Sequence, residues 1–239
     1  MPPLVDPVVP VRPPRLTEQP VIPVDAVNAL MRRWRRDDAP QLVAALADTQ
    51  IQRWNLYGLK TIGESHHWID HWGARWRKGT GASWAIVDDK RPSVVLGQMA
   101  FRSLYLADGL AELSCWVMPN ARHRHLATEA TRALTEWAFD TLGLVRLEIV
   151  HSTQNSSSCS VALRAGFRKE GVLRHLQRHA DGFHDMCLHS RIKKDDGRPI
   201  VPPPVPAPDE LAARRRRRRL GEFLKRPEKV VGAGVAAGS

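Results

Sequence analysis

Residues 112–140 read ELSCWVMPNARHRHLATEATRALTEWAFD, and this stretch decides the fold. Residues 112–118 alternate between the two faces of a strand, with Leu113, Cys115 and Val117 on one face. An apolar stripe at helical spacing follows, made of Leu126, Ala130, Ala133, Leu134, Trp137 and Ala138. The basic loop of residues 122–127 joins strand to helix, so the free amide groups of the helix's first turn emerge from a cationic loop. This arrangement predicts an anion-binding site.

The segments before this stretch show both helical and strand patterns. Asp37 or Asp38 can cap a helix with Pro40 in its first turn. A later helix carries tryptophans at helical spacing, which predicts core packing or the floor of a substrate cleft rather than a cofactor site. The predicted ranges are a strand over residues 24–34, a helix over 66–76, and strands over 83–87 and 94–104.

The segments after it continue the alternation. Gly143 ends the long helix, Asn155 or Ser156 can cap a short one, and Asp181-Gly182 is a strong hairpin signal. The predicted strands cover residues 146–151, 169–179 and 183–192. The order of elements predicts an α/β fold with a mixed, mostly antiparallel sheet flanked by helices.

Composition divides the 239 residues into three parts. Residues 1–23 are a Pro-rich leader in which we expect little packed structure. Residues 24–194 form the predicted domain, and residues 195–239 a Pro-rich linker and a basic Arg-rich tail, disordered or partly helical. Residues 198–239 hold ten basic and four acidic residues, which is +6 of the formal charge of +11, so the tail makes the chain strongly basic.

Several classes of protein are disfavoured by patterns that the sequence lacks. No apolar run approaches the length of a membrane span and the start lacks the order of a signal peptide, so a cytoplasmic protein is expected. Cys115, Cys159 and Cys187 form an odd set without C-x-x-C, which predicts neither a disulfide framework nor a zinc-thiolate site. His67 and His71 share a helix face without an H-E-x-x-H motif, so no metal is expected there.

The loop Arg122-x-x-His125-x-Ala127 resembles the Q/R-x-x-G-x-G/A acyl-CoA loop of the GNAT N-acetyltransferase superfamily. The words AELSCWVMP, GLVRLEIVHSTQN and SSSCSVALRAGF are similar to its RimJ/RimL-type branch, the ribosomal-protein-alanine N-acetyltransferase-like proteins, and the resemblance covers roughly residues 25–192. It implies the GNAT fold, in which the fourth and fifth strands splay apart to admit the pantetheine arm. It also implies acetyl-CoA as cosubstrate and no metal.

The resemblance implies which residues contact the coenzyme. Amide groups of residues 122–127, aided by Arg122 and Arg124, would bind the pyrophosphate at the helix start. Asn155 would contact the pantetheine, and the end of the preceding strand would line its path. The implied coenzyme residues are Trp116, Val117, Met118, Arg122, His123, Arg124, His125, Leu126, Ala127 and Asn155.

Two histidines depart from the family pattern, because His123 and His125 stand where glycine is usual. Glycine there permits positive φ and a close approach of phosphate to the backbone. Two outcomes are open: the rings point outward, or they crowd the phosphate and weaken binding.

The catalytic residues are less clear from sequence. Glu112 matches a position where the branch commonly has Glu and could take the amine proton through water, or it could be a surface carboxylate. Ser158 matches the family's serine and could hydrogen-bond the departing thiolate, although Asn155 and Ser158 could equally serve to cap the helix. No tyrosine follows Tyr105, so the acid that some GNAT enzymes use is missing.

The expected function is transfer of an acetyl group from acetyl-CoA to a primary amine, with the α-amino group of a protein or peptide as the favoured acceptor. A small-molecule amine such as an aminoglycoside or polyamine is the alternative within enzymes. A non-catalytic scaffold is the alternative outside them. Arg214–Arg219 could then contact RNA or the ribosome, or simply be a solvated tail.

Overall fold

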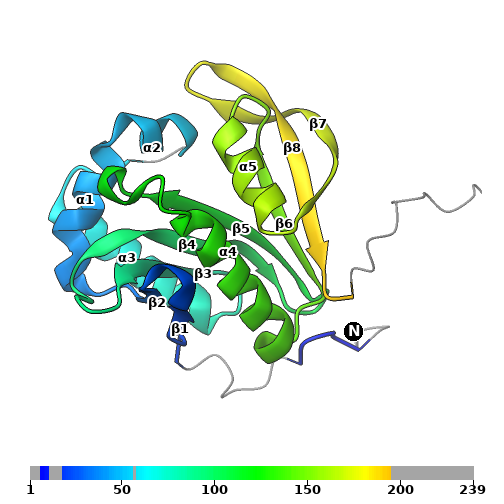
Figure 1. Cartoon of the computed structure of the whole chain (residues 1–239), viewed down its shortest axis with the longest axis horizontal. Coiled ribbons are helices and arrows are strands. Elements are labelled where there is room, and N and C mark those ends of the chain that lie inside the picture. The colour runs from blue at the N-terminus through cyan, green and yellow to red at the C-terminus, as the bar shows by residue number, and fades with distance from the viewer. Residues whose placement is uncertain (1–5, 11–17, 56–57, 195–239) are drawn as a thin grey trace, which may run out of the picture. The chain divides into compact units, whose positions relative to one another are not determined.

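The computed structural model describes residues 6–10, 18–55 and 58–194. Its centre is an eight-stranded sheet with the order β1-β2-β3-β4-β5-β6-β8-β7 (Figure 1). Helices cover both faces, which confirms the predicted mixed α/β fold. The strands are β1 Ile22–Val24, β2 Ala29–Arg33, β3 Ala82–Asp88, β4 Val95–Tyr105, β5 Leu110–Val117, β6 Arg146–Ser152, β7 Arg168–His179 and β8 Gly182–Ile192.

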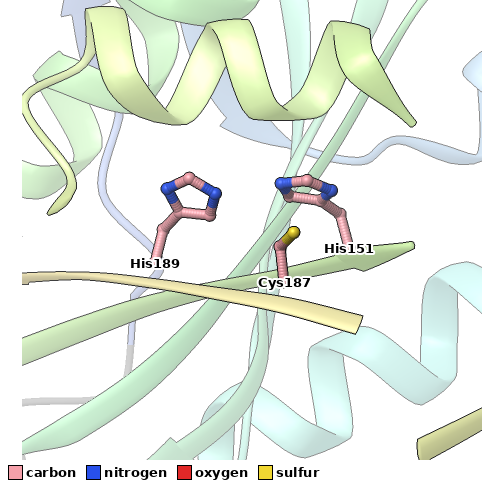
Figure 2. Close-up of side chains that lie close together, drawn as sticks. All are labelled: His151, Cys187 and His189. Atoms are coloured by element: carbon pink, nitrogen blue, oxygen red, sulfur yellow. The ribbon is translucent and has the colours of Figure 1, made fainter. Parts of the chain in front are cut away.

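The helices divide between the two faces of the sheet. Helices α4 and α5 lie on one face and α1 and α3 on the other, and α5 covers the β6–β8 pair (Figures 1 and 2). None of the described helices is long and apolar enough to cross a membrane. The α-helices are α1 Ala39–Ala47, α2 Thr49–Trp54, α3 Ile62–Arg77, α4 Leu126–Trp137 and α5 Ser156–Arg164.

Strands β5 and β6 run parallel and separate along their length. They pair from Leu110 with Arg146 to Leu113 with Ile149, and no further. Beyond that point β5 continues to Val117 and β6 to Ser152 without pairing with each other. All other neighbouring strands in the described sheet pair antiparallel. The separation of β5 from β6, which correspond to the fourth and fifth strands of the family fold, is the splay that the family resemblance implied.

The predicted tryptophan stripe belongs mostly to the core. Trp76 packs on Trp84, whose ring lies edge-on to Phe101 at 5.4 Å. Trp84 is fully buried, and burying such large side chains contributes roughly 25 cal/mol for each Å² of apolar surface. Trp72, one turn before Trp76, also lines a cavity, so both sequence interpretations hold for different members of the stripe.

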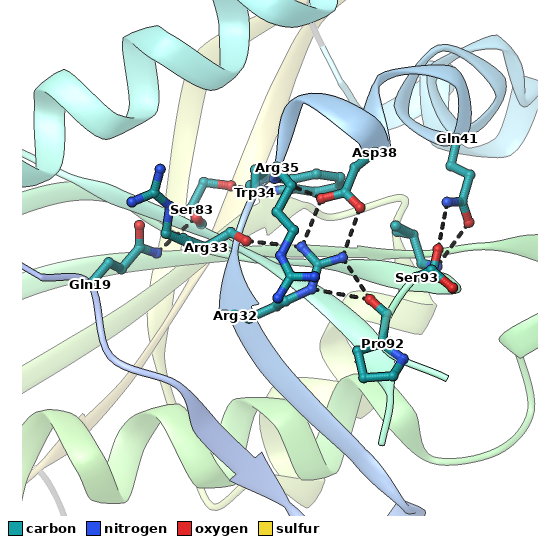
Figure 3. A network of polar contacts seen from close by, with 11 residues as sticks. Gln19, Arg32, Arg33, Trp34, Arg35, Asp38, Gln41, Ser83, Pro92 and Ser93 are labelled. Carbon is teal, nitrogen blue, oxygen red and sulfur yellow. Dashed lines mark hydrogen bonds and ion pairs between the residues drawn. The ribbon is translucent and has the colours of Figure 1, made fainter. Parts of the chain in front are cut away.

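A buried ion pair joins three parts of the first half of the domain (Figure 3). Arg32 donates to both carboxylate oxygens of Asp38 at 2.7 Å, and its Nη2 also donates to the Pro92 carbonyl at 2.7 Å. Asp38 in turn accepts from the Arg35 amide at 2.7 Å. The pair therefore fixes β2, the start of α1 and the β3–β4 turn against one another.

The leader is more ordered than predicted where it is described. The amides of Val8 and Val9 donate to the carbonyls of Ala107 and Leu106, and Val9 is buried. The expectation of little packed structure was wrong for these residues and for residues 18–23. The single strand predicted over residues 24–34 is instead a pair, β1 and β2, joined by a tight turn in which Asn28 has φ 51°. Pro23 is tolerated because β1 is an edge strand, where a missing amide donor costs little.

Helix α2 was not predicted from the sequence, because its six residues carry too few apolar positions to show a helical period. The Arg-rich tail predicted at residues 195–239 lies outside the described residues.

Candidate active site

A cavity of about 790 Å³ opens where β5 and β6 separate. Its walls come from both strands, from the start of α4, from α2 and α5, and from the β7–β8 hairpin. Among the described residues that line it there are three arginines, Arg102, Arg122 and Arg164, and no aspartate or glutamate. Asp48 and Glu112, which lie outside the wall, pair with Arg122 and Arg102, so among the described residues the wall offers cations no carboxylate of its own.

The start of α4 provides hydrogen-bond donors at one end of the cavity. The amide groups of residues 125–128 have no acceptor among the described residues, as expected for a first helical turn. His123 and His125 have φ values of 60° and 57°, the left-handed conformation that favours glycine. Both residues are exposed and both lie on the cavity rim. The backbone therefore keeps the conformation of a glycine loop although glycine is absent.

Arg122 is occupied by an ion pair. Its Nη2 donates to Asp48 Oδ1 at 2.6 Å, and its Nε donates to the Val117 carbonyl at 3.3 Å. The Asp48 carboxylate also caps α2 by accepting from the Ile51 amide at 2.9 Å. The hydrogen bond from Arg122 is the main reason that the pKa of Asp48 is lowered. Arg122 thus holds α2 against the loop of residues 122–127, a role the sequence did not indicate.

The N-terminal end of α5 lies on the same cavity. Asn155 is buried and its Oδ1 accepts from the Ser158 amide at 3.0 Å, so the capping interpretation is confirmed. The Ser158 hydroxyl makes no hydrogen bond to the described residues, and both side chains line the cavity. Capping and contact with a ligand are therefore compatible here.

Of the twelve residues predicted to act in the site, nine line the cavity. They are Trp116, Val117, Arg122, His123, His125, Leu126, Ala127, Asn155 and Ser158. Met118, Arg124 and Glu112 do not. Glu112 sits on β5 with Arg102 Nη1 at 3.5 Å. Burial raises the pKa of Glu112, while Arg102 opposes the shift. Arg102 lies on the cavity wall, so Glu112 reaches the cavity only through that neighbour or through water.

A hydrogen-bonded chain on the hairpin side was missed by the sequence analysis. His184 Nε2 lies 2.8 Å from Asp181 Oδ1, and its Nδ1 lies 2.8 Å from Ser152 Oγ. Because a carboxylate only accepts, Nε2 carries hydrogen and the Ser152 hydroxyl can donate to Nδ1. Ser152 lines the cavity and Asp181 is exposed, so this hydrogen-bonded chain connects the cavity with the protein surface. Its members come from β6 and the β7–β8 hairpin, and no local sequence motif links them.

A second group of side chains lies on the face that α5 covers (Figure 2). His151, Cys187 and His189 are all buried, and one potential ligand atom from each lies within 4.8 Å of the others. Burial lowers the pKa of both histidines, which keeps the imidazoles neutral. The metal candidates in the sequence were His67 and His71, which are both exposed, and the cysteine set, in which no zinc-thiolate site was predicted.

Comparisons with known proteins agree with this geometry. Residues 28–168 match the family model of the acetyltransferase (GNAT) domain. The uncharacterized N-acetyltransferase YoaA of Bacillus subtilis is 25% identical over 175 residues, which cover 73% of this chain and 97% of the relative.

Two solved structures with bound coenzyme have a similar fold. RimL, the ribosomal L7/L12 alpha-N-protein acetyltransferase in complex with coenzyme A, has a TM-score of 0.66 at 18% identity and covers 72% of this chain and 98% of its own. Microcin C7 self-immunity acetyltransferase MccE, in complex with acetyl-CoA and AMP, has a TM-score of 0.63 at 19% identity. The match covers 69% of this chain and 92% of the MccE chain. With the splayed strands, the glycine-like loop and the family match together, the chain belongs to the GNAT family of acetyl-CoA-dependent N-acetyltransferases.

Proposed function

We propose that this protein transfers the acetyl group of acetyl-CoA to the N-terminal α-amino group of a protein or peptide. The observation that carries this proposal is the composition of the cavity wall, which has three arginines, two of them paired with carboxylates outside the wall, and no carboxylate of its own among the described residues. A polyamine or aminoglycoside carries several positive charges and would find no carboxylate on this wall to bind them. An N-terminus presents one amine, and acidic side chains beside it would be attracted. RimL, which shares the fold, is by its description an α-N-protein acetyltransferase.

The coenzyme is proposed to enter between β5 and β6. The free amides at the start of α4 would bind the pyrophosphate, and the unpaired ends of the two strands would accept the pantetheine arm. Acetyl-CoA supplies the activated acetyl thioester. The Asn155 amide and the Ser158 hydroxyl line the same cavity at the start of α5, where the hydroxyl can donate a hydrogen bond to sulfur.

The amine must lose a proton before it attacks the carbonyl carbon. Glu112 is one proposed acceptor of this proton, through water, because its raised pKa makes it a better base than an exposed carboxylate. The Ser152–His184–Asp181 chain is the other, because Ser152 lines the cavity directly. Replacing Glu112 by Gln and Ser152 by Ala in separate variants distinguishes the two routes. The variant that removes the true proton acceptor should lower kcat by about 100-fold or more.

The acceptor is tested with a panel of peptides that differ in their first residues, set beside spermidine and an aminoglycoside. Mass spectrometry of each mixture with acetyl-CoA should show a mass increase on peptides alone, greatest for those with acidic residues near the N-terminus. Acetylation of the polycations in preference to every peptide would overturn the proposal. Calorimetry with acetyl-CoA, run in parallel, separates a wrong acceptor from an inactive preparation.

The Arg-rich tail leads to a separate proposal about partners. Arg214–Arg219 would contact RNA without sequence preference, which would bring a cytoplasmic enzyme of this kind close to ribosomal substrates. Binding to RNA should then weaken steeply with salt and be lost on deletion of residues 198–239. Unchanged binding after the deletion would contradict this role.

A further inference from the structure

Three side chains with metal-ligating atoms share one face of the β6–β8 pair. Cys187 and His189 are two residues apart on β8, so both project from the same face. His151 on β6 lies directly opposite Cys187 in the strand register. Two residues on one strand and one on its neighbour can converge, and one ligand atom from each lies within 4.8 Å of the others. Figure 2 shows the two rings beside each other with Cys187 pointing toward them.

One ring nitrogen of His151 has no hydrogen-bond partner among the described residues. His151 Nδ1 lies 2.8 Å from the Ser152 carbonyl, which can only accept, so Nδ1 carries hydrogen and Nε2 keeps its lone pair. His151 Nε2 is buried without a hydrogen-bond partner, and so is His189 Nδ1. A buried polar group left unpaired is destabilising. A backbone carbonyl holding the second ring nitrogen is also the usual support for a histidine that binds a metal.

We propose that His151, Cys187 and His189 bind one zinc-type ion. Two neutral imidazoles and a thiolate select Zn²⁺ and related transition ions over Mg²⁺ or Ca²⁺, which prefer oxygen ligands. Binding converts the Cys187 thiol to a thiolate, and the proton is released to solvent. His151 also lines the cavity, so a water entering from that side would take the fourth ligand position of a tetrahedral ion. Acetyl transfer in this family needs no metal, and the ion instead stabilises the β6–β8 wall beneath α5.

The test measures metal binding by the full-length protein without acetyl-CoA or an acceptor. After treatment with a chelator, calorimetry with Zn²⁺ should show one ion bound per chain. Co²⁺ should give the absorption bands of a thiolate-bound tetrahedral ion. Zn²⁺ at 100 times its Kd should raise the unfolding free energy, and hence Tm, by the RT ln(1 + [L]/Kd) relation.

Cys187→Ser should abolish the thiolate band and weaken Zn²⁺ binding by at least about tenfold, or 1.4 kcal/mol. Cys115→Ser is the matched control, because Cys115 lies on the cavity wall outside the group and its loss should change neither result. His189→Gln is a second variant, and Tm values of the metal-free proteins show whether each one folds. Absence of stoichiometric binding, or equal binding by wild type and both folded variants, would overturn the proposal. Because acetyl transfer is not measured, these outcomes are independent of the proposed function.

Discussion

Replacing His125 by glycine tests whether its side chain obstructs the coenzyme. His125 has φ 57° and ψ 9° at the N-cap of α4, beside the free amides of the helix start. The residue is exposed, which favours the outcome in which the ring points away from the phosphate. The variant restores the family's usual residue without changing any hydrogen bond of the His125 side chain to the described residues.

The expected change in stability is small because two terms oppose each other. A non-glycine residue in the left-handed region costs about 1–2 kcal/mol, and histidine lies at the low end of that range. Glycine adds backbone entropy to the unfolded chain, which offsets about 0.4–1 kcal/mol. The net gain is therefore about 0–1 kcal/mol, and each kcal/mol shifts Tm by about 2–4 °C in a domain of this size.

Thermal unfolding and calorimetry with acetyl-CoA give the two readouts. Asn28→Gly is the matched control, because Asn28 also has a left-handed φ, 51°, is exposed and does not line the cavity. Both variants should change stability by no more than about 1 kcal/mol, and His125→Gly should change the Kd of acetyl-CoA by less than about tenfold, or 1.4 kcal/mol. A larger increase in affinity for His125→Gly alone would refute this reasoning and show that the imidazole crowds the phosphate.

Three other predictions concern ionised groups. Asp38→Ala should lower the unfolding free energy by about 3–5 kcal/mol, because it leaves the guanidinium of Arg32 buried without a carboxylate partner. Urea titration measures this loss, and an unchanged unfolding midpoint would contradict it. Glu112→Gln should stabilise the protein at neutral pH and not below about pH 4, because a carboxyl with a raised pKa costs stability only when ionised; an equal gain at both pH values would exclude this cause. The Asp48–Arg122 pair should stabilise the fold above the unfolded-state pKa of Asp48, and this stability should be lost as pH falls through the lowered pKa of Asp48 in the folded protein. Asp48→Asn should therefore make the unfolding free energy less dependent on pH in the acidic range, and an unchanged dependence would contradict this.

The fold was largely predictable because its signals are local. The 112–140 stretch predicted a strand, a loop and a helix, which the structure has as β5 and α4. A π-helical segment, Ala138–Leu142, continues α4 and ends at Gly143, whose φ is 87°. Asp181-Gly182 marked the hairpin of β7 and β8, and Asn155 caps α5 as expected. Each of these depends on turn or cap chemistry that neighbouring residues fix by themselves.

Features that depend on distant contacts were not predictable from single positions. Arg122 reads as a phosphate-binding residue in its motif, yet its partner is Asp48, which is far away in sequence. The group formed by His151, Cys187 and His189 depends on a strand register that periodicity cannot supply. The packing of Val9 against the domain depends on the Leu106 carbonyl in the turn after β4, which also accepts from the Gly109 amide.

The position of Arg122 bears on how the two halves of the site are coordinated. Its guanidinium contacts Asp48 at the start of α2, and α2 supplies Ile51 and Trp54 to the cavity wall. The same residue belongs to the loop whose amides lead into α4. A phosphate arriving at that loop would compete with Asp48 for the guanidinium, because both are anions within reach of one cation. If the coenzyme's pyrophosphate binds at this loop, as proposed above, coenzyme binding and the placement of α2 are coupled through one ion pair. A substitution at Asp48 should then alter the acceptor side and the coenzyme side together.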